Sequence, residues 1–256
     1  MKLFCCSDLH SFYEPFKKAL DEKCFEENNS EHLLLVLGDV FDRGPDSVQI
    51  WKYLDSLTNV ILIRGNHEDL LEEMLLRGYG ERHDKSNGTF RTVCDFADIA
   101  TNRNNLVEVC KEVEKLLSPF LAKFIDYFET EHYIFVHSWL PCTIRYDGSD
   151  ETKPWYTRNK VYDFMPDWRE ANEVEWTDAR WGNPFELANA GLNKTGKTIV
   201  FGHWHTSWPR HQYENKPEFL DGADFSPYYG ENFIGLDACT AGSKTCNVIV
   251  LEDNLI

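Results

Sequence analysis

Short apolar runs recur along the chain, and most of them lead directly into polar residues. The runs are four to six residues long and rich in β-branched or aromatic side chains, as is typical of buried strands. They cover residues 3–6, 33–37, 60–63, 133–136, 198–201, 233–236 and 246–251. The last two runs are joined by a loop that contains glycine, so we expect them to pair as antiparallel strands.

Between the early runs, apolar residues recur at helical spacing. Phe16, Leu20 and Cys24 follow Pro15 at intervals of four, and Pro suits the first turn of a helix. Residues 46–57 and 68–77 are two further helix candidates. Alternation of strand and helix predicts an α/β fold with parallel pairing in the first half of the chain. A two-layer β-sandwich flanked by helices fits this order.

Two regions interrupt the alternation. Residues 79–130 hold mostly helical sequence, especially 106–128, and residues 141–197 are richer in Pro, Trp and Tyr. No long linker separates them, so we expect one domain over residues 1–256 with a helical and an aromatic-rich insertion. The aromatic residues of the second insertion would either pack its interior or stack a base; they are Trp155, Tyr156, Trp168, Trp176 and Trp181.

The net charge of the chain limits the classes of molecule that we expect it to bind. The 256 residues carry a net charge of −17, although the hydrophobic content of 42% is ordinary for a globular protein. A strongly acidic surface repels the phosphate backbone, which argues against broad binding to nucleic acid or to an anionic membrane. A local basic pocket remains compatible with it, because exposed charges are screened beyond about 8 Å at physiological salt.

The cysteines and the apolar runs indicate a cytoplasmic protein. None of the eight cysteines forms a C-x-x-C pair, and most lie in apolar surroundings, so we expect reduced, mostly buried thiols. The first apolar run is too short for a signal peptide. No stretch approaches the ~20 apolar residues of a membrane span.

Five polar motifs supply Asp, Asn and His side chains, which are the ligands of a two-metal centre that cleaves phosphoesters. Each motif directly follows an apolar run, and in α/β sheets ligands tend to bind at this end of the strands. The motifs are Ser7-Asp8-Leu9-His10, Gly38-Asp39-Val40-Phe41-Asp42-Arg43-Gly44, Arg64-Gly65-Asn66-His67-Glu68, Val136-His137-Ser138 and Phe201-Gly202-His203-Trp204-His205-Thr206.

Single residues of these motifs suit particular roles. Asp39 can bridge two cations with its two carboxylate oxygens, and Arg43 offers a planar fork for phosphate oxygens. Asn66 supplies a neutral oxygen to a metal, and His67 can donate a proton to a leaving oxygen.

The last motif brings two histidines close together. On an extended segment His203 and His205 face the same side, which suits two imidazoles that reach one metal pair.

Each motif alone also has an ordinary explanation. Asp8 and His10 would form a turn, and residues 38–44 a solvated charged loop. Asn66 would cap a helix that begins near Glu68. His137 would be a buried histidine and His205 a surface one. The five motifs in order are what favours the metal centre.

In this order the motifs resemble the calcineurin-like metallophosphoesterase superfamily. The intact Asp42-Arg43-Gly44 and Asn66-His67-Glu68 are most similar to bacterial and phage serine/threonine phosphoprotein phosphatases and to the related dinucleoside tetraphosphate hydrolases. The segment 175–180, Glu-Trp-Thr-Asp-Ala-Arg, is loosely similar to the Trp-Ser-Asp region of that branch.

The resemblance implies a four-layer α/β/β/α sandwich and assigns the residues of the centre. Asp8, His10 and Asp39 would bind one metal, and Asp39, Asn66, His137 and His203 the other. Asp42 would orient His67, the general acid. Arg43 and Arg64 would clamp the phosphate, with Arg180 as a further candidate, and Asn66 would also contact the substrate.

Two motifs depart from the phosphatase branch. Ser7 and Ser11 stand where that branch has glycine, and the last motif reads Gly-His-Trp-His where it has Gly-His-Thr. A Gly-His-x-His ending is more usual elsewhere in the superfamily, where the second histidine joins the first metal. His205 is therefore a further candidate ligand.

The function that follows is hydrolysis of a phosphoester by a hydroxide that two divalent metals activate. Mixed oxygen and nitrogen ligands suit Mn²⁺ first, with Fe or Zn²⁺ as alternatives. We expect phosphoserine or phosphothreonine in proteins as the substrate, and a dinucleoside tetraphosphate as the alternative. A nuclease and a catalytically silent binding module are two further hypotheses.

Overall fold

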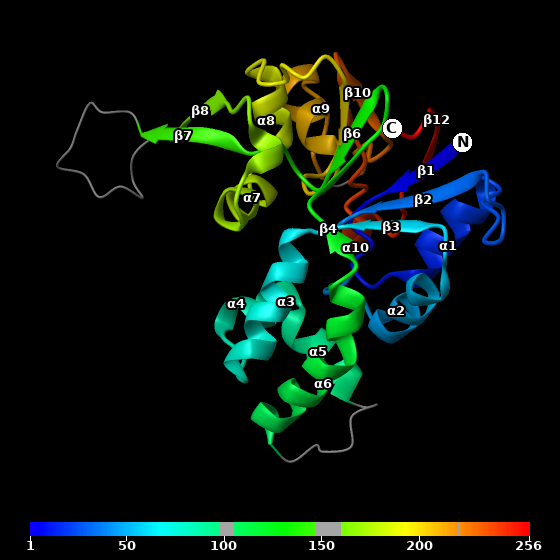
Figure 1. Ribbon diagram of the computed structural model, residues 1–256, viewed down its shortest axis with the longest axis vertical. Coiled ribbons are helices and arrows are strands. Elements are labelled where there is room, and N and C mark those ends of the chain that lie inside the picture. Colours follow the sequence, from blue (N-terminus) through cyan, green and yellow to red (C-terminus); the bar gives the residue numbers. More distant parts are fainter. Residues whose placement is uncertain (98–104, 147–159, 220) are drawn as a thin grey trace.

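The chain folds into two five-stranded sheets that face each other, with helices on the outer side of each (Figure 1). The computed structural model describes residues 1–97, 105–146, 160–219 and 221–256. The first sheet has the strand order β12-β1-β2-β3-β4 and the second the order β10-β11-β9-β6-β5. This arrangement confirms the expected four-layer α/β/β/α sandwich.

The first sheet is built from the early alternation of strand and helix. Its parallel strands are β1 (Lys2–Cys6), β2 (His32–Leu37), β3 (Val60–Ile63) and β4 (Phe124–Ile125). The connecting helices are α1 (Tyr13–Glu22), α2 (Ser47–Ser56) and α3 (Asn66–Arg77). Parallel pairing in the first half of the chain is therefore confirmed.

The second sheet combines parallel and antiparallel pairs. Strand β9 (Thr198–Phe201) lies parallel to β6 (Tyr133–Val136) on one side and to β11 (Phe233–Gly235) on the other. The edge strands β5 (Tyr127–Glu129) and β10 (Tyr228–Gly230) run antiparallel to their neighbours.

The expectation that the last two strands pair with each other is wrong. Strand β11 lies in the second sheet, whereas β12 (Ile249–Glu252) crosses to the first sheet and pairs antiparallel with β1. The short helix α10 (Thr240–Ser243) lies in the connection. Two apolar strands close in sequence predict a hairpin, but each found its apolar partner in a different sheet.

Alternating side chains of β1 are apolar and buried on both faces of the first sheet. Leu3 and Cys5 point into the core between the sheets, where they meet Phe135 and Val200 of the second sheet. Phe4 belongs to the core under the helices on the outer face of the first sheet. Strands that are apolar on both faces are stable only when both faces are buried, so four layers follow from the strand composition.

The helical insertion lies beside α3 and forms the lower lobe of the molecule in Figure 1. Its helices are α4 (Arg82–Asn87), α5 (Thr89–Ala97) and α6 (Leu106–Leu121). We expected helical sequence as far as residue 128, but the helix ends at Leu121, and β4 and β5 follow as edge strands of the two sheets. Edge pairing with β3 and β6 decides the conformation of these last residues.

The aromatic-rich insertion covers the second sheet. It holds the β7 (Cys142–Tyr146) and β8 (Lys160–Phe164) hairpin, a 3-10 turn at Trp168–Glu170, and helices α7 (Glu173–Arg180) and α8 (Pro184–Asn189). Helix α9 (Ser207–Glu214) follows β9. Trp168, Trp176 and Phe185 are buried with Ile199 and Phe201 in one core, so these aromatic side chains pack the insertion.

All eight cysteines lie in the described part of the chain, and none of them forms a disulfide. Among the described helices, none combines the length and the apolar character that crossing a bilayer requires.

Candidate metal centre

The five polar motifs meet at one edge of the sandwich. Register places the ends of the parallel strands side by side, because Cys6 pairs with Val36 and Leu37 with Ile63. Backbone hydrogen bonds then tie the loops together: the Asp8 N–H donates to Gly38 O (3.1 Å), and the Gly202 N–H donates to His137 O (2.7 Å). Segments almost two hundred residues apart are held as one site.

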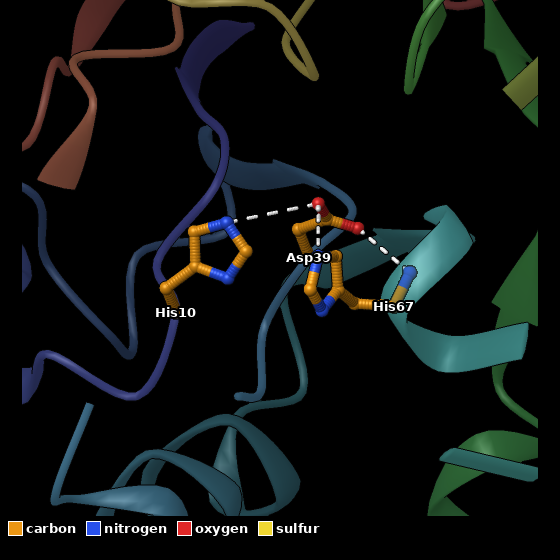
Figure 2. Close-up of side chains that lie close together, drawn as sticks. All are labelled: His10, Asp39 and His67. Carbon is orange, nitrogen blue, oxygen red and sulfur yellow. Dashed lines mark hydrogen bonds and ion pairs between the residues drawn. The ribbon is translucent and has the colours of Figure 1, made fainter. Parts of the chain in front are cut away.

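Asp39 lies at the middle of this site (Figure 2). Its Oδ2 is 3.7 Å from His10 Nε2, and its Oδ1 is 3.3 Å from His137 Nε2. The backbone N–H of His67 donates to Oδ1 (3.0 Å). The carboxylate therefore has one oxygen facing each of two histidine groups, as a bridging ligand requires.

The first group of candidate ligands converges on one point. Asn66 Oδ1 lies 2.9 Å from both His137 Nε2 and His203 Nδ1, and the two ring nitrogens are 3.2 Å apart. His137 donates its Nδ1–H to Leu37 O (2.7 Å), so its Nε2 carries a lone pair. Lone pairs of two imidazoles, an amide oxygen and Asp39 thus face each other with at most one proton among them. Such a set fits a cation.

The second group lies on the other side of Asp39. His10 donates its Nδ1–H to Phe41 O (3.0 Å), so its Nε2 lone pair faces Asp39 Oδ2. Asp8 lies beside this group, and its Oδ2 accepts the backbone N–H of His203 (2.9 Å). His10, Asp39 and His67 form one cluster with metal-ligating atoms within 4.8 Å, and Asp39, His137 and His203 form a second.

Burial lowers the pKa of two histidines at the site and raises the pKa of Asp8. It lowers the pKa of His137, and it lowers the pKa of His203 to about 3 with help from His137, so both rings are neutral and able to bind metal. Burial, together with the neighbouring carboxylates of Asp237 and Asp39, raises the pKa of Asp8 well above its ordinary value. A buried cluster of acidic groups is stabilised when cations neutralise it.

Backbone strain marks the same residues. Asp8, His10, Asp39, Asp42, Arg43 and His203 all have φ between 46° and 75°. Left-handed backbone at a residue with a side chain costs about 1–3 kcal/mol and persists where the surrounding structure enforces it, often at functional sites.

Gly38 shows why the motif needs glycine. A Cβ there would lie 2.5 Å from His137 Nδ1, and φ is +83°. No side chain fits between the second motif and the fourth.

Asp42, His67 and Arg43 form a second unit next to the metal ligands. The His67 Nδ1–H donates to Asp42 Oδ2 (2.7 Å), and Arg43 Nη2 lies 3.1 Å from His67 Nε2. Burial alone would lower the pKa of His67, but Asp39 and the hydrogen bond to Asp42 outweigh it and raise the pKa above its ordinary value. An imidazole with a raised pKa and a guanidinium beside it suit an acid next to a phosphate clamp.

Arg64 and Arg180, which we expected to clamp phosphate, bind carboxylates instead. Arg64 forms ion pairs with Asp69 (2.8 Å) and with Glu72, and it lines a cavity of about 300 Å³ between α3 and α6. Arg180 donates to Asp69 (2.7 Å) and Asp126 (2.8 Å). Both guanidinium groups are satisfied by acidic partners that the sequence did not identify. The arrangement supports Arg43 as the clamp and does not support these two.

The structure does not bring His205 to His203, contrary to our expectation that the two rings face the same side. The segment turns instead of extending, because His203 has φ +66° and the Trp204 N–H donates to Gly202 O (2.7 Å). His205 Nε2 lies 3.1 Å from Glu218 Oε1, and its ring contacts Phe219. His205 belongs to neither cluster of metal-ligating side chains.

Asn66 and the start of α3 also differ from the helix-cap alternative. The helix begins at Asn66, after Gly65, and the Asn66 side chain turns toward the histidines. Glu68, to which we had given no role, closes this end of the helix. Its buried carboxylate accepts the N–H groups of Gly65 (2.8 Å), Asp39 (2.9 Å) and Val40 (3.0 Å), so it joins two motifs.

Three further residues at the site escaped the sequence analysis. Asp237 is buried near Asp8, and burial raises its pKa to about 6. It directly follows an apolar run, as the other motifs do, so the same rule would have found it. Thr89 and Thr92 donate to Asp42 from α5, and nothing in their local sequence indicates it.

Among the described aromatic residues of the second insertion, Trp181 lies at the candidate centre. Its ring meets His203 edge-to-face at 6.2 Å between centroids, and 49% of the residue is exposed. Trp176 stacks on Tyr127 in the core, and Trp168 meets Tyr127 edge-to-face. Trp155 and Tyr156 lie outside the described residues.

Comparison with known proteins places these observations in a family. The family model described as calcineurin-like phosphoesterase matches residues 1–207. Curated relatives include the symmetrical bis(5'-nucleosyl)-tetraphosphatase of Buchnera aphidicola, 39% identical over 69 residues, which are 27% of this chain and 24% of that protein. The enzyme of the same name from Erwinia tasmaniensis is 27% identical over 122 residues, covering 46% and 43% of the two chains. The chain thus matches about a quarter to less than half of the length of these relatives.

Solved structures share the fold along nearly the whole chain. A putative diadenosine tetraphosphatase superposes with a TM-score of 0.50 and 14% identity over 98% of this chain and 92% of that one. A cold-active protein-tyrosine phosphatase of a psychrophilic Shewanella superposes with a TM-score of 0.50 and 15% identity, over 99% and 76%. Because the family model covers most of the chain and its motifs form the centre described above, the chain belongs to the calcineurin-like phosphoesterase family.

Proposed function

We propose that this chain hydrolyses phosphoesters with the help of two divalent cations. The observation that carries the proposal is the convergence of His137 Nε2, Asn66 Oδ1 and His203 Nδ1 on one another, with His137 Nε2 facing one oxygen of Asp39 and His10 Nε2 facing the other. Five motifs from both sheets place these atoms, and no ordinary hydrogen-bonding scheme supplies enough protons to satisfy them.

The residues divide between two cation sites that share Asp39. Asn66, His137 and His203 would hold one cation with Asp39, and His10 and Asp8 the other. When bound, the two cations supply an activated water and neutralise charge on the phosphate oxygens. Ligands of oxygen and nitrogen without sulfur favour Mn²⁺, with Fe or Zn²⁺ as alternatives.

His67 would act as the general acid. Its Nδ1–H is held by Asp42, so Nε2 is the ring nitrogen that would give a proton to the leaving oxygen. Arg43, which is exposed beside Nε2, would bind the phosphate oxygens and stabilise their charge. Asn66 would contact the substrate as well as the metal.

The preferred substrate is phosphoserine or phosphothreonine in a protein. The motifs Asp42-Arg43-Gly44 and Asn66-His67-Glu68 are intact, and the structure brings their side chains together as this chemistry requires. The acidic net charge of −17 argues against nucleic acid. Eight cysteines without a disulfide support a cytoplasmic location.

A dinucleoside tetraphosphate is the second candidate, and two observations favour it. The curated relatives that match this chain carry the name of symmetrical tetraphosphatases. Trp181 is half-exposed next to His203, where its indole ring would stack a nucleobase of a bound substrate.

Metal removal and add-back test the reaction itself. Chelated protein should not turn over p-nitrophenyl phosphate, and Mn²⁺, Zn²⁺ or Mg²⁺ added separately should show which ion restores turnover. Full activity of protein that contains no metal by elemental analysis would refute the proposal.

A substrate panel then separates the two candidates. A phosphothreonine peptide and diadenosine tetraphosphate would be compared by kcat/KM for the wild type and for Trp181→Ala, with Tyr229→Ala as an exposed aromatic control outside the site. If a base stacks on Trp181, the variant should raise KM for the dinucleotide about tenfold and leave the peptide unchanged. Equal effects on both substrates would remove the stacking argument.

A further inference from the structure

The carboxylate of Asp42 is held by more than His67. Asp42 Oδ2 accepts the hydroxyl of Thr89 (2.6 Å) as well as His67 Nδ1–H (2.7 Å), and Oδ1 accepts the hydroxyl of Thr92 (2.7 Å). Asp42 and Thr89 are fully buried, and Thr92 is 1% exposed. Each hydroxyl has a single proton to give. Both oxygens of the carboxylate are therefore fixed by donors from the helical insertion.

The start of α5 is built around this contact. Thr92 Oγ1 also accepts the backbone N–H of Asp42 (3.1 Å), so a single side chain holds both the main chain and the carboxylate of that residue. Gly88, directly before Thr89, approaches so closely that a Cβ would lie 2.2 Å from Arg43 N. The insertion thus encloses the turn that carries both Asp42 and Arg43.

We propose that Thr89 and Thr92 are positioning residues for proton donation by His67. They act through Asp42: their hydroxyls fix the carboxylate plane, so that Oδ2 meets Nδ1–H and the ring presents Nε2 to the leaving oxygen. The inference rests on the proposed function, because it assigns these residues a part in the protonation of the leaving group.

The geometry makes a specific demand on the kinetics. A group that only orients the proton donor contributes where the leaving oxygen needs a proton, and contributes little where the leaving group departs unaided. Loss of either hydroxyl should therefore affect substrates in proportion to the basicity of their leaving groups. A residue that merely stabilises the fold would affect all substrates alike.

The test uses single Thr89→Val and Thr92→Val variants, which keep shape and lose the hydroxyl. With the metal that supports wild-type turnover, kcat on phenyl phosphate should fall about 10- to 100-fold and kcat on 2,4-dinitrophenyl phosphate less than threefold. KM and metal content should not change. Thr89→Ser and Thr92→Ser keep the hydroxyl and should restore most of the loss.

Thr130→Val is the matched control. The Thr130 hydroxyl also donates to a buried carboxylate, Asp253 (2.7 Å), but it lies in the β5–β6 connection, outside the site. Loss of the Thr130 hydroxyl should lower the melting temperature without changing the ratio of kcat on phenyl phosphate to kcat on 2,4-dinitrophenyl phosphate. Equal losses on both aryl phosphates in the Thr89 and Thr92 variants, or serine variants as slow as the valine variants, would overturn the proposal.

A measurement without turnover separates this proposal from the proposed function. In ¹⁵N-labelled, metal-free protein, the His67 Nδ1 proton should exchange slowly in the wild type and at least tenfold faster in either valine variant. Unchanged exchange would overturn the positioning role even if the wild type hydrolysed no phosphoester. If a valine substitution prevents folding, alanine at the same position removes the same hydroxyl.

Discussion

At the residue scale, Asp39 is the residue on which both proposed cation sites would depend. It faces His10 with one oxygen and His137 with the other, and Gly65 leaves room for it, since a Cβ there would lie 2.3 Å from Asp39 Oδ1. Most other candidate ligands serve one side only. A change at Asp39 should therefore affect both cations, whereas a change at His203 should affect one.

We predict that Asp39→Asn weakens both metals, because an amide presents one oxygen where the carboxylate presents two. Apparent affinity should fall at least about tenfold, as measured by titration and by elemental analysis after dialysis. Asp55→Asn, at an exposed aspartate that pairs with Lys123, is the control. A variant that retains two metals per chain would contradict the bridging role.

A change at His67 is expected to affect catalysis without affecting metal binding. We predict that His67→Ala keeps its metals and loses about 10²- to 10⁴-fold in kcat on a substrate with a poor leaving group. Elemental analysis and turnover of an alkyl phosphate would be measured on the same sample. His211→Ala, at an exposed histidine on α9, should behave as the wild type. Unchanged turnover of the alkyl phosphate by His67→Ala would remove this residue from the mechanism.

At the element scale, α3 and α5 connect the metal centre with the helical insertion. Helix α3 begins with Asn66 and His67 and is closed by Glu68, while α5 contributes the two hydroxyls on Asp42. The sequence predicted α3 within two residues at its start, since the expected range began at Glu68. It did not predict that the insertion would contact the second motif, because that contact joins segments about fifty residues apart.

The junction between α4 and α5 gives a test of this connection. Gly88 has φ +98° and no space for a Cβ, whereas Gly196 has φ +77° with nothing within 4 Å. We predict that Gly196→Ala costs about 1 kcal/mol of unfolding free energy from backbone strain alone. Gly88→Ala should cost about 1–3 kcal/mol more, because the methyl group collides with the Arg43 backbone.

Urea unfolding would measure the two free energies, and turnover would be followed in parallel. Gly88→Ala should also lower kcat, because the collision displaces the turn that carries Asp42 and Arg43. Equal stability of the two alanine variants would show that this junction is loosely packed.

At the scale of the whole molecule, Asp253 joins the end of the chain to the second sheet. Its carboxylate accepts the Thr130 hydroxyl (2.7 Å) and the backbone N–H of His132 (2.8 Å), and it lies 2.7 Å from His132 Nδ1. Strand β12 belongs to the first sheet, so this cluster fastens the two sheets at the end opposite the metal centre.

The cluster predicts a dependence of stability on pH. Hydrogen bonds from His132 and Thr130 outweigh burial and lower the pKa of Asp253, so its contribution is present above about pH 4 and is lost as the pH falls through the folded pKa. Asp253 raises the pKa of His132. The stabilisation from the protonated His132 ring is therefore present below about pH 6.5 and is lost as the pH rises through the folded pKa of His132.

Asp253→Asn should therefore destabilise the protein most between about pH 4 and 6.5, where the ionised Asp253 and the protonated His132 are both present. Urea unfolding of the wild type and the variant from pH 4 to 9 would measure the difference. In the His132→Ala background the decline above pH 6.5 should disappear, while the hydrogen bond from Thr130 remains. A difference that does not vary with pH would show that His132 takes no part.

The sequence by itself determined the strands that precede the polar motifs, most of the early helices and the candidate residues of the site. Those features depend on local composition and on spacing over a few residues, and the polar motifs directly follow the apolar runs. The family and its four layers followed from the same motifs.

Only the tertiary structure decided which side chains meet. Arg64 and Arg180 form ion pairs with Asp69, and His205 lies beside Glu218. The hydroxyls of Thr89 and Thr92 donate to Asp42. The directions of several of these side chains are set by left-handed turns and by partners far along the chain. The spacing of residues in the sequence predicts neither the left-handed turns nor the distant partners, because both are stabilised by the packed structure around them.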